Sequence, residues 1–150
     1  MKLEHVEVTV DIQATTQHVW DAITNWTAQD KWMLGTRVTP VHGDGKDIGG
    51  QIEAFTGIWK IGFLDTMEIT RWDPPHRCDV IHTGRVVRGT GTFAVSALSA
   101  QTSRFVWSED LDLPLGIIGK IGFWLMKPLF VAGVRQSLAK FANLVEQGQI

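Results

Sequence analysis

The sequence has no tyrosine, a single cysteine and no excess of charge of one sign. The lone cysteine, Cys78, excludes a disulfide within the chain, and its place in an expected strand favours a small buried hydrophobic side chain over a nucleophile. The 14 basic and 16 acidic side chains nearly cancel and form no run of like charge, so the basic footprint of a nucleic-acid-binding protein is missing. We expect no nucleic-acid partner.

The spacings that mark metal sites and common nucleophiles are also missing. The glycines between Gly43 and Gly50 lack the lysine and hydroxyl pair of a phosphate-binding loop, and no glycine-serine-glycine elbow occurs. The five histidines are scattered and show no ligand spacing for a metal: His5, His18, His42, His76 and His82. We therefore expect no metal and no cofactor, so that any chemistry must come from polar residues on inward strand faces.

The N-terminal residues lead directly into a strand pattern. Residues 1–5 leave no room for the apolar core of a signal peptide, so we expect a cytoplasmic protein. The length of 150 residues fits one domain, residues 1–150, large enough for a core and a cavity.

Most of the chain shows strand patterns separated by turn residues. Thr15 is placed to cap a first short helix, and Thr27 with Asp30 resembles a capping box for a second. Glycines and aspartates between Gly43 and Gly50 predict a hairpin, and Pro74-Pro75 predicts a turn. The expected strands cover residues 5–12, 37–41, 50–55, 62–72, 77–83, 86–97 and 104–113. An antiparallel meander of about seven strands follows, with two short helices after the first strand.

The C-terminal stretch from Pro114 to Gln147 predicts a long helix. Its second half is amphipathic, whereas residues 117–130 are apolar nearly all round. Pro128 should kink or break the helix and reset the phase of its apolar stripe, giving one bent helix or two in tandem. A transmembrane span is the rival interpretation, but Lys120, Lys127 and several glycines interrupt the run.

These features together resemble the helix-grip superfamily of polyketide cyclase/dehydrase and lipid transport proteins, also called SRPBCC, START or Bet v 1-like. The resemblance covers essentially the whole chain and rests on the order of its parts. They are Val6-Glu7-Val8-Thr9-Val10, Ala14, Val19-Trp20-Asp21-Ala22, Gly49-Gly50, Trp72-Asp73-Pro74-Pro75-His76-Arg77 and Trp107-Ser108-Glu109. The resemblance implies an α+β fold in which a curved seven-stranded antiparallel sheet grips the C-terminal helix.

The resemblance also implies an internal cavity for a small hydrophobic ligand such as a lipid, polyketide or quinone. It does not choose between a binding module and a cyclase or dehydratase that acts on a bound polyketide-like substrate by acid/base catalysis. A third hypothesis is an interaction protein. Whether the protein is an enzyme stays open at this point.

Strand parity selects three candidate catalytic residues. Glu109 shares a strand face with Phe105, Trp107 and Leu111, so a carboxylate is expected among bulky apolar neighbours. The same parity places His82 with Cys78 and Val80, and Asp65 with Phe63 and Met67. The alternative is that each is a rim residue or a core polar group satisfied by a backbone amide. Four arginines are expected on a solvated face, with one of them as an alternative partner for Glu109: Arg71, Arg85, Arg88 and Arg104.

The expected ligand-binding residues come from the strands and the terminal helix. They are Met67, Phe93, Phe105, Trp107, Ile121, Trp124 and Leu125. If these helix residues turn inward, Phe123, Met126, Leu129 and Phe130 must meet a lid, a second subunit or a membrane. We place a homodimer ahead of transient membrane contact, because a net charge of −2 gives little attraction to lipid.

Overall fold

The structure is a computed structural model that describes residues 3–150; Met1 and Lys2, part of the N-terminal stretch considered for a signal peptide, lie outside the described residues. The described chain contains the following elements in order: β1 (Glu4–Ile12), α1 (Thr16–Ile23), the 3₁₀ helix η1 (Trp26–Lys31), β2 (Thr36–His42), β3 (Gln51–Ile58), β4 (Ile61–Asp73), β5 (Arg77–His82), β6 (Gly89–Ser99), β7 (Thr102–Leu111) and α2 (Gly116–Glu146). The predicted α+β architecture is confirmed, with all seven expected strands.

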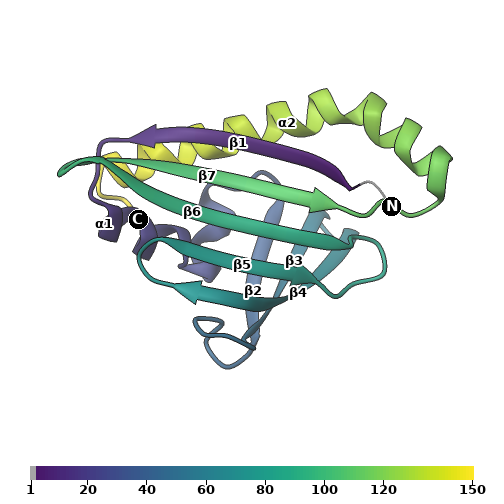
Figure 1. Ribbon diagram of the computed structural model, residues 1–150, viewed down its shortest axis with the longest axis horizontal. Coiled ribbons are helices and arrows are strands. Elements are labelled where there is room, and N and C mark those ends of the chain that lie inside the picture. Colours follow the sequence, from purple (N-terminus) through teal and green to yellow (C-terminus); the bar gives the residue numbers. More distant parts are fainter. Residues whose placement is uncertain (1–2) are drawn as a thin grey trace.

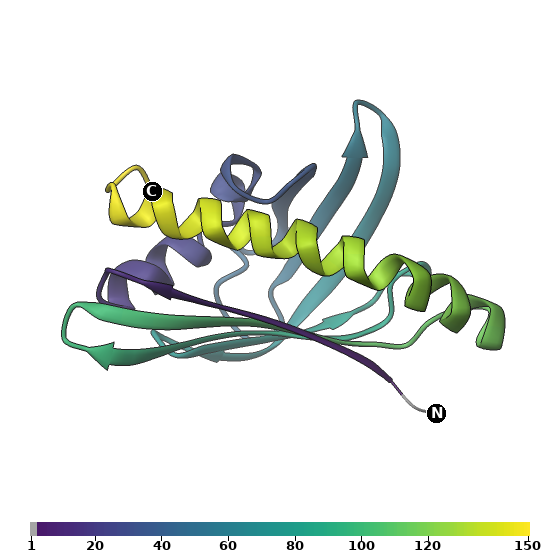
Figure 2. The same cartoon turned by 90° about the horizontal axis from the view of Figure 1, so that it is seen from above.

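The strands form one antiparallel sheet in the order β1-β7-β6-β5-β4-β3-β2. Strands β2 to β7 follow one another as hairpins, and β1 closes against β7, with Val8 opposite Trp107. The sheet is curved, and α2 lies across its concave side (Figures 1 and 2). The polar turns around Gly43–Gly50 and Pro74-Pro75 connect strands as predicted.

The two short helices begin differently from one another. Thr15 caps α1 as expected, because its hydroxyl oxygen accepts a hydrogen bond from the His18 N–H at 3.2 Å. The predicted capping box at Thr27 is wrong, since η1 begins at Trp26 after Asn25. The Thr27 hydroxyl points back to the Asn25 side chain at 3.4 Å instead.

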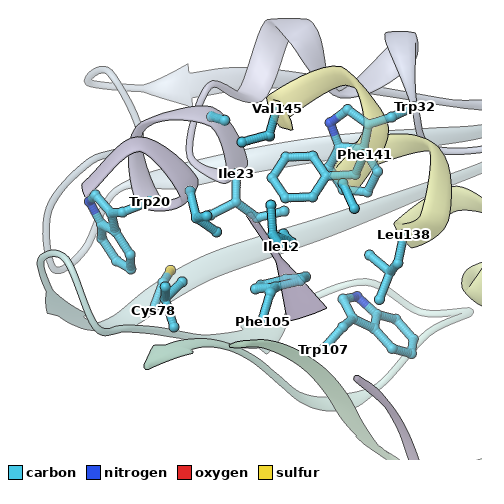
Figure 3. Close-up of a cluster of buried hydrophobic side chains, with 14 of the residues drawn as sticks. Ile12, Trp20, Ile23, Trp32, Cys78, Phe105, Trp107, Leu138, Phe141 and Val145 are labelled. Carbon is cyan, nitrogen blue, oxygen red and sulfur yellow. The ribbon is translucent and has the colours of Figure 1, made fainter. Parts of the chain in front are cut away.

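Helix α2 runs without interruption through Pro128 and has two unlike halves. All its fully buried side chains lie in the second half: Val134, Ser137, Leu138, Phe141, Ala142 and Val145. They pack against α1, η1 and the sheet, where Phe141 contacts Trp32 and Phe105 (Figure 3). The first half lies mostly outside this core, where Phe123 and Val131 are partly buried against it. Only 6% of the residues are buried in an 18-residue stretch of α2 whose mean hydropathy is 1.5.

Cys78 is a core residue, as its strand position predicted. Its side chain lies among the buried hydrophobic residues near Trp20 and Ile12 (Figure 3). Burial raises the pKa of the Cys78 thiol to about 12, so the thiol stays protonated at neutral pH. A nucleophilic role for this side chain finds no support.

Candidate functional site

A cavity of about 600 Å³, partly open to solvent, lies between the concave sheet and the first half of α2. Its size falls in the range of small-molecule sites, and its walls are mostly apolar. Met67, Phe93 and Trp107, three of the expected ligand-binding residues, line it from β4, β6 and β7. The ring of Trp107 lies 5.9 Å from that of Phe130 on α2, which forms the opposite wall.

The other four expected ligand-binding residues lie elsewhere. Phe105 is fully buried in the core, 5.5 Å ring to ring from Phe93, and does not reach the cavity. Ile121, Trp124 and Leu125 point away from the cavity and are exposed.

The expected orientation of the first half of α2 is therefore inverted. The cavity is lined instead by side chains assigned to the outer face: Phe123, Met126, Leu129 and Phe130. The reason is that Pro128 leaves the helix unbroken, so the apolar stripe keeps its phase. Phe123, Met126 and Phe130 continue, at helical spacing, the stripe that Val134 and Leu138 begin.

Three polar side chains on the cavity wall form a hydrogen-bonded chain, which we call the acid/base triad: Asp65, His82 and Glu109. The two carboxylate oxygens of Asp65 both lie 2.9 Å from Nδ1 of His82. Nε2 of the same imidazole lies 2.7 Å from Oε2 of Glu109. All three line the cavity, and the His82 side chain is only 3% exposed. Strand alternation predicted that the three residues face inward, and in the structure hydrogen bonds connect them.

Gly91 makes the bond between His82 and Glu109 geometrically feasible. His82 lies on β5 and Glu109 on β7, with β6 between them, so the two backbones are about 10 Å apart at the usual strand spacing. Gly91 of β6 is directly opposite Glu109. A Cβ atom at Gly91 would lie 2.9 Å from Oε1 and 3.0 Å from Oε2 of Glu109. The missing side chain leaves the space in which the Glu109 carboxylate meets the imidazole.

The triad has an unusual charge state because its members are buried together. Burial by itself lowers the pKa of His82, but the hydrogen bonds to Asp65 and Glu109 outweigh it and raise that pKa to about 9. The imidazole is therefore protonated at neutral pH. Burial raises the pKa of Glu109, although the hydrogen bond from His82 opposes this rise. His82 and Glu109 thus compete for the proton that lies between Nε2 and Oε2.

Glu109 pairs with His82 and not with one of the arginines considered as alternative partners. Three of the candidate arginines form ion pairs away from the triad: Arg71 with Asp73, Arg88 with Asp112 and Arg104 with Asp11. Sequence reasoning also missed Gly91. The signal available was the Gly89-Thr90-Gly91 alternation, which removes two inward side chains from a strand.

Trp59 and Trp72 do not line the cavity. Trp72 packs its ring 5.0 Å from that of Trp20 and 6.5 Å from that of Trp26, so it fills space beside the core. Trp59 lies at the tip of the β3–β4 hairpin and is 92% exposed. Within residues 3–150, no group of histidine, cysteine and acidic side chains is arranged to hold a metal ion.

Gly91→Ala tests whether the missing side chain at Gly91 is what allows Glu109 to reach His82. We expect the added methyl to push the Glu109 carboxylate away from His82 and so lower the pKa of His82 from its value of about 9. Stability at neutral pH should fall with the pKa of His82, by about 1.4 kcal/mol for each unit that the pKa drops, whereas alanine itself fits a strand better than glycine. NMR titration of the imidazole measures the shift. Gly122→Ala, where a Cβ meets nothing within 4 Å, is the control; an unchanged His82 titration in Gly91→Ala would contradict the argument.

The fold and cavity together define a helix-grip protein with an apolar cavity, in whose wall Asp65, His82 and Glu109 are hydrogen-bonded. Residues 4–146 match the family described as polyketide cyclase / dehydrase and lipid transport, and the chain belongs to that family. Proteins of this fold typically bind hydrophobic ligands, and aromatase/cyclases are among those of similar structure. No curated protein matches the chain.

Solved structures of similar fold extend over nearly the whole chain. The Zhui aromatase/cyclase from Streptomyces sp. R1128 has a TM-score of 0.79 at 14% identity, covering 97% of this chain and 94% of that one. TTHA0849 from Thermus thermophilus has a TM-score of 0.77 at 16% identity, covering 98% and 100%. The Aha1 dimer from Colwellia psychrerythraea has a TM-score of 0.69 at 13% identity, covering 98% and 99%. At these identities the similarity shows the fold alone.

Proposed function

We propose that the protein is an acid/base enzyme of the cyclase or dehydratase type, acting on a hydrophobic substrate that carries carbonyl groups. One observation carries the proposal, namely the Asp65–His82–Glu109 chain in the wall of an apolar cavity. A carrier needs only apolar walls and an orienting group. Burying two carboxylates and an imidazolium is costly, so a site that retains them is a candidate for proton transfer.

Glu109 is the residue that we assign to proton transfer. Its Oε2 accepts from His82, whereas among the described residues no hydrogen bond engages its Oε1, so that oxygen is free to meet a ligand. The general base takes a proton from a carbon next to a substrate carbonyl. It then returns the proton to a departing hydroxyl group, so that water leaves and a carbon–carbon double bond forms.

Asp65 and His82 are positioning residues in this scheme. Asp65 accepts from Nδ1 and fixes the orientation of the imidazole, and Nε2 fixes the Glu109 carboxylate. Because His82 is buried between two acids, its positive charge also offsets the charge that the base would otherwise leave in an apolar wall. The three residues thus keep one carboxylate ionisable at neutral pH in surroundings that favour its neutral form.

Simple carriage of a hydrophobic ligand is the second candidate function. The exposed apolar residues around the cavity mouth favour it, because a carrier must collect its ligand from another surface. Both functions use the cavity. An enzyme should make a bound ketone exchange protons faster than it does in buffer, whereas a carrier should not.

Deuterium exchange into 2-tetralone, a hydrophobic bicyclic ketone, tests the proposal. We expect the protein in D₂O to accelerate exchange at the carbons beside the carbonyl, followed by NMR, by at least about 100-fold over buffer. Tetralin, the same ring system without the carbonyl, should inhibit by competing for the cavity. Binding of 2-tetralone without acceleration would overturn the enzyme proposal and leave the carrier.

A further inference from the structure

Three segments that line the cavity also carry exposed apolar side chains, and we take them as its mouth. They are the β3–β4 hairpin, residues 55–64, the β5–β6 loop, residues 83–90, and the first half of α2 with the turn before it, residues 114–133. Each contributes side chains to the cavity lining, for example Phe63, Val86 and Phe123. We call these three segments the mouth rim.

The mouth rim exposes large apolar side chains to solvent. At the hairpin tip, Trp59 is 92% exposed and Ile61 is 85% exposed. On α2, Ile118 is 76% exposed and Trp124 is 72% exposed. Figure 2 shows the β3–β4 hairpin projecting from the sheet on the side that α2 covers, with the first half of α2 reaching outward beside it. Two protruding apolar elements therefore flank one opening.

The charge of the mouth rim differs from that of the whole protein. Its three segments contain five basic residues, Lys60, Arg85, Arg88, Lys120 and Lys127, and no aspartate or glutamate. The rest of the chain has 9 of the 14 basic and all 16 acidic side chains. Arg88 is paired with Asp112, and Lys127 donates to the His5 carbonyl oxygen. Lys60 and Arg85 are exposed. The three rim segments are thus basic although the whole chain has a net charge of −2, and Asp112 beside them neutralises one of the five basic residues, Arg88.

We propose that the mouth rim docks on an anionic lipid surface, with the hairpin tip and the first half of α2 inserted among the headgroups. Exposed aromatic and aliphatic side chains suit the boundary between headgroups and acyl chains, and basic residues beside them are attracted to anionic lipid. The docked orientation would turn the cavity mouth towards the bilayer. A hydrophobic ligand could then enter without crossing water, whether the protein goes on to convert it or to carry it.

A second copy of this chain fits the mouth rim less well. In a two-fold dimer the same surface occupies both sides of the interface. Because the rim has basic side chains and no acidic ones, such pairing would bring like charges together, which costs affinity. The charge pattern therefore favours an anionic partner over a copy of the rim, in contrast to the preference for a dimer based on net charge.

Vesicle flotation tests the proposal with two pairs of variants. The protein should float with phosphatidylcholine vesicles that contain phosphatidylglycerol, and much less with pure phosphatidylcholine. Lys60→Gln with Lys120→Gln should weaken binding about 30-fold, at the usual contribution of a basic residue near an anionic surface. Ile61→Ser with Ile118→Ser should weaken it about tenfold or more through lost apolar burial.

Matched variants control for general effects of the same substitutions. Lys46→Gln with Lys140→Gln removes two exposed charges elsewhere, and Ile48→Ser with Leu98→Ser removes two exposed apolar side chains elsewhere. Both should float like the wild type. Equal losses in rim and control variants, equal binding to both kinds of vesicle, or no flotation of the wild type would each overturn the proposal. A wild-type dimer in sedimentation that ignores vesicles and that the rim variants dissociate would identify a second copy as the occupant instead.

Discussion

Glu109→Gln is expected to lower the rate of deuterium exchange into 2-tetralone by at least about 100-fold, the lower end of what a positioned general base contributes. Glutamine has nearly the same shape, and its amide oxygen can still accept from Nε2 of His82 at the position now 2.7 Å away. It cannot take up a proton at neutral pH. The binding of 2-tetralone should change little, because the apolar walls stay in place.

Two measurements keep this result interpretable. Glu68→Gln makes the same chemical change on the opposite face of β4, where adjacent residues alternate, and should leave the exchange rate unaltered. Thermal unfolding of Glu109→Gln should show an intact cooperative transition. A variant that folds, binds 2-tetralone and exchanges it at the wild-type rate would remove Glu109 from the role of base.

The unfolding free energy should fall by about 3 kcal/mol as the pH rises from about 6.5 to about 9, since each unit of pKa shift corresponds to about 1.4 kcal/mol. The folded-state pKa of His82, about 9, lies above its ordinary value of 6.5. The folded protein therefore holds this proton more tightly than the unfolded chain. The stabilisation is complete below pH 6.5 and is lost as the pH approaches 9.

Urea unfolding at a series of pH values measures this dependence. His5 is the other histidine with a raised pKa, through its hydrogen bond to Asp110, but its side chain is exposed. His5→Gln should therefore retain most of the fall in stability. An NMR titration of the His82 imidazole should give a midpoint near pH 9. A flat unfolding free energy between pH 6.5 and 9 would show that the triad does not hold the extra proton.

The strands could be predicted because their pattern is local. In β1 the buried Val6, Val8 and Ile12 alternate with exposed residues, as a half-buried strand requires. The Thr15 cap is equally local, since its hydroxyl bonds to a backbone group three residues away. The order of the hairpins follows from short connections. These features need no knowledge of which distant residues meet.

The candidate site was predictable only in part because it depends on distant residues. Parity placed Asp65, His82 and Glu109 on inward faces, but the pairing of His82 with Glu109 spans three strands and requires the register of β6. No sequence pattern supplied that register. The prediction of which face of α2 points inward was wrong for a related reason, since the effect of Pro128 on the helix depends on the packing on both sides of it. Net charge averages over surfaces that the fold separates, so it does not describe the basic mouth rim.

Only one of the two halves of α2 is anchored in the core. Val134, Leu138 and Phe141 fix the second half in the core, while the first half crosses the cavity with an exposed outer face. If the first half of α2 moves away from the cavity, only the contacts of that half are lost, and the second half stays packed in the core. The wall of the cavity and the core of the protein therefore have separate stabilities. Substitutions in the first half of α2 can therefore change the shape of the cavity wall without weakening the core that holds the second half.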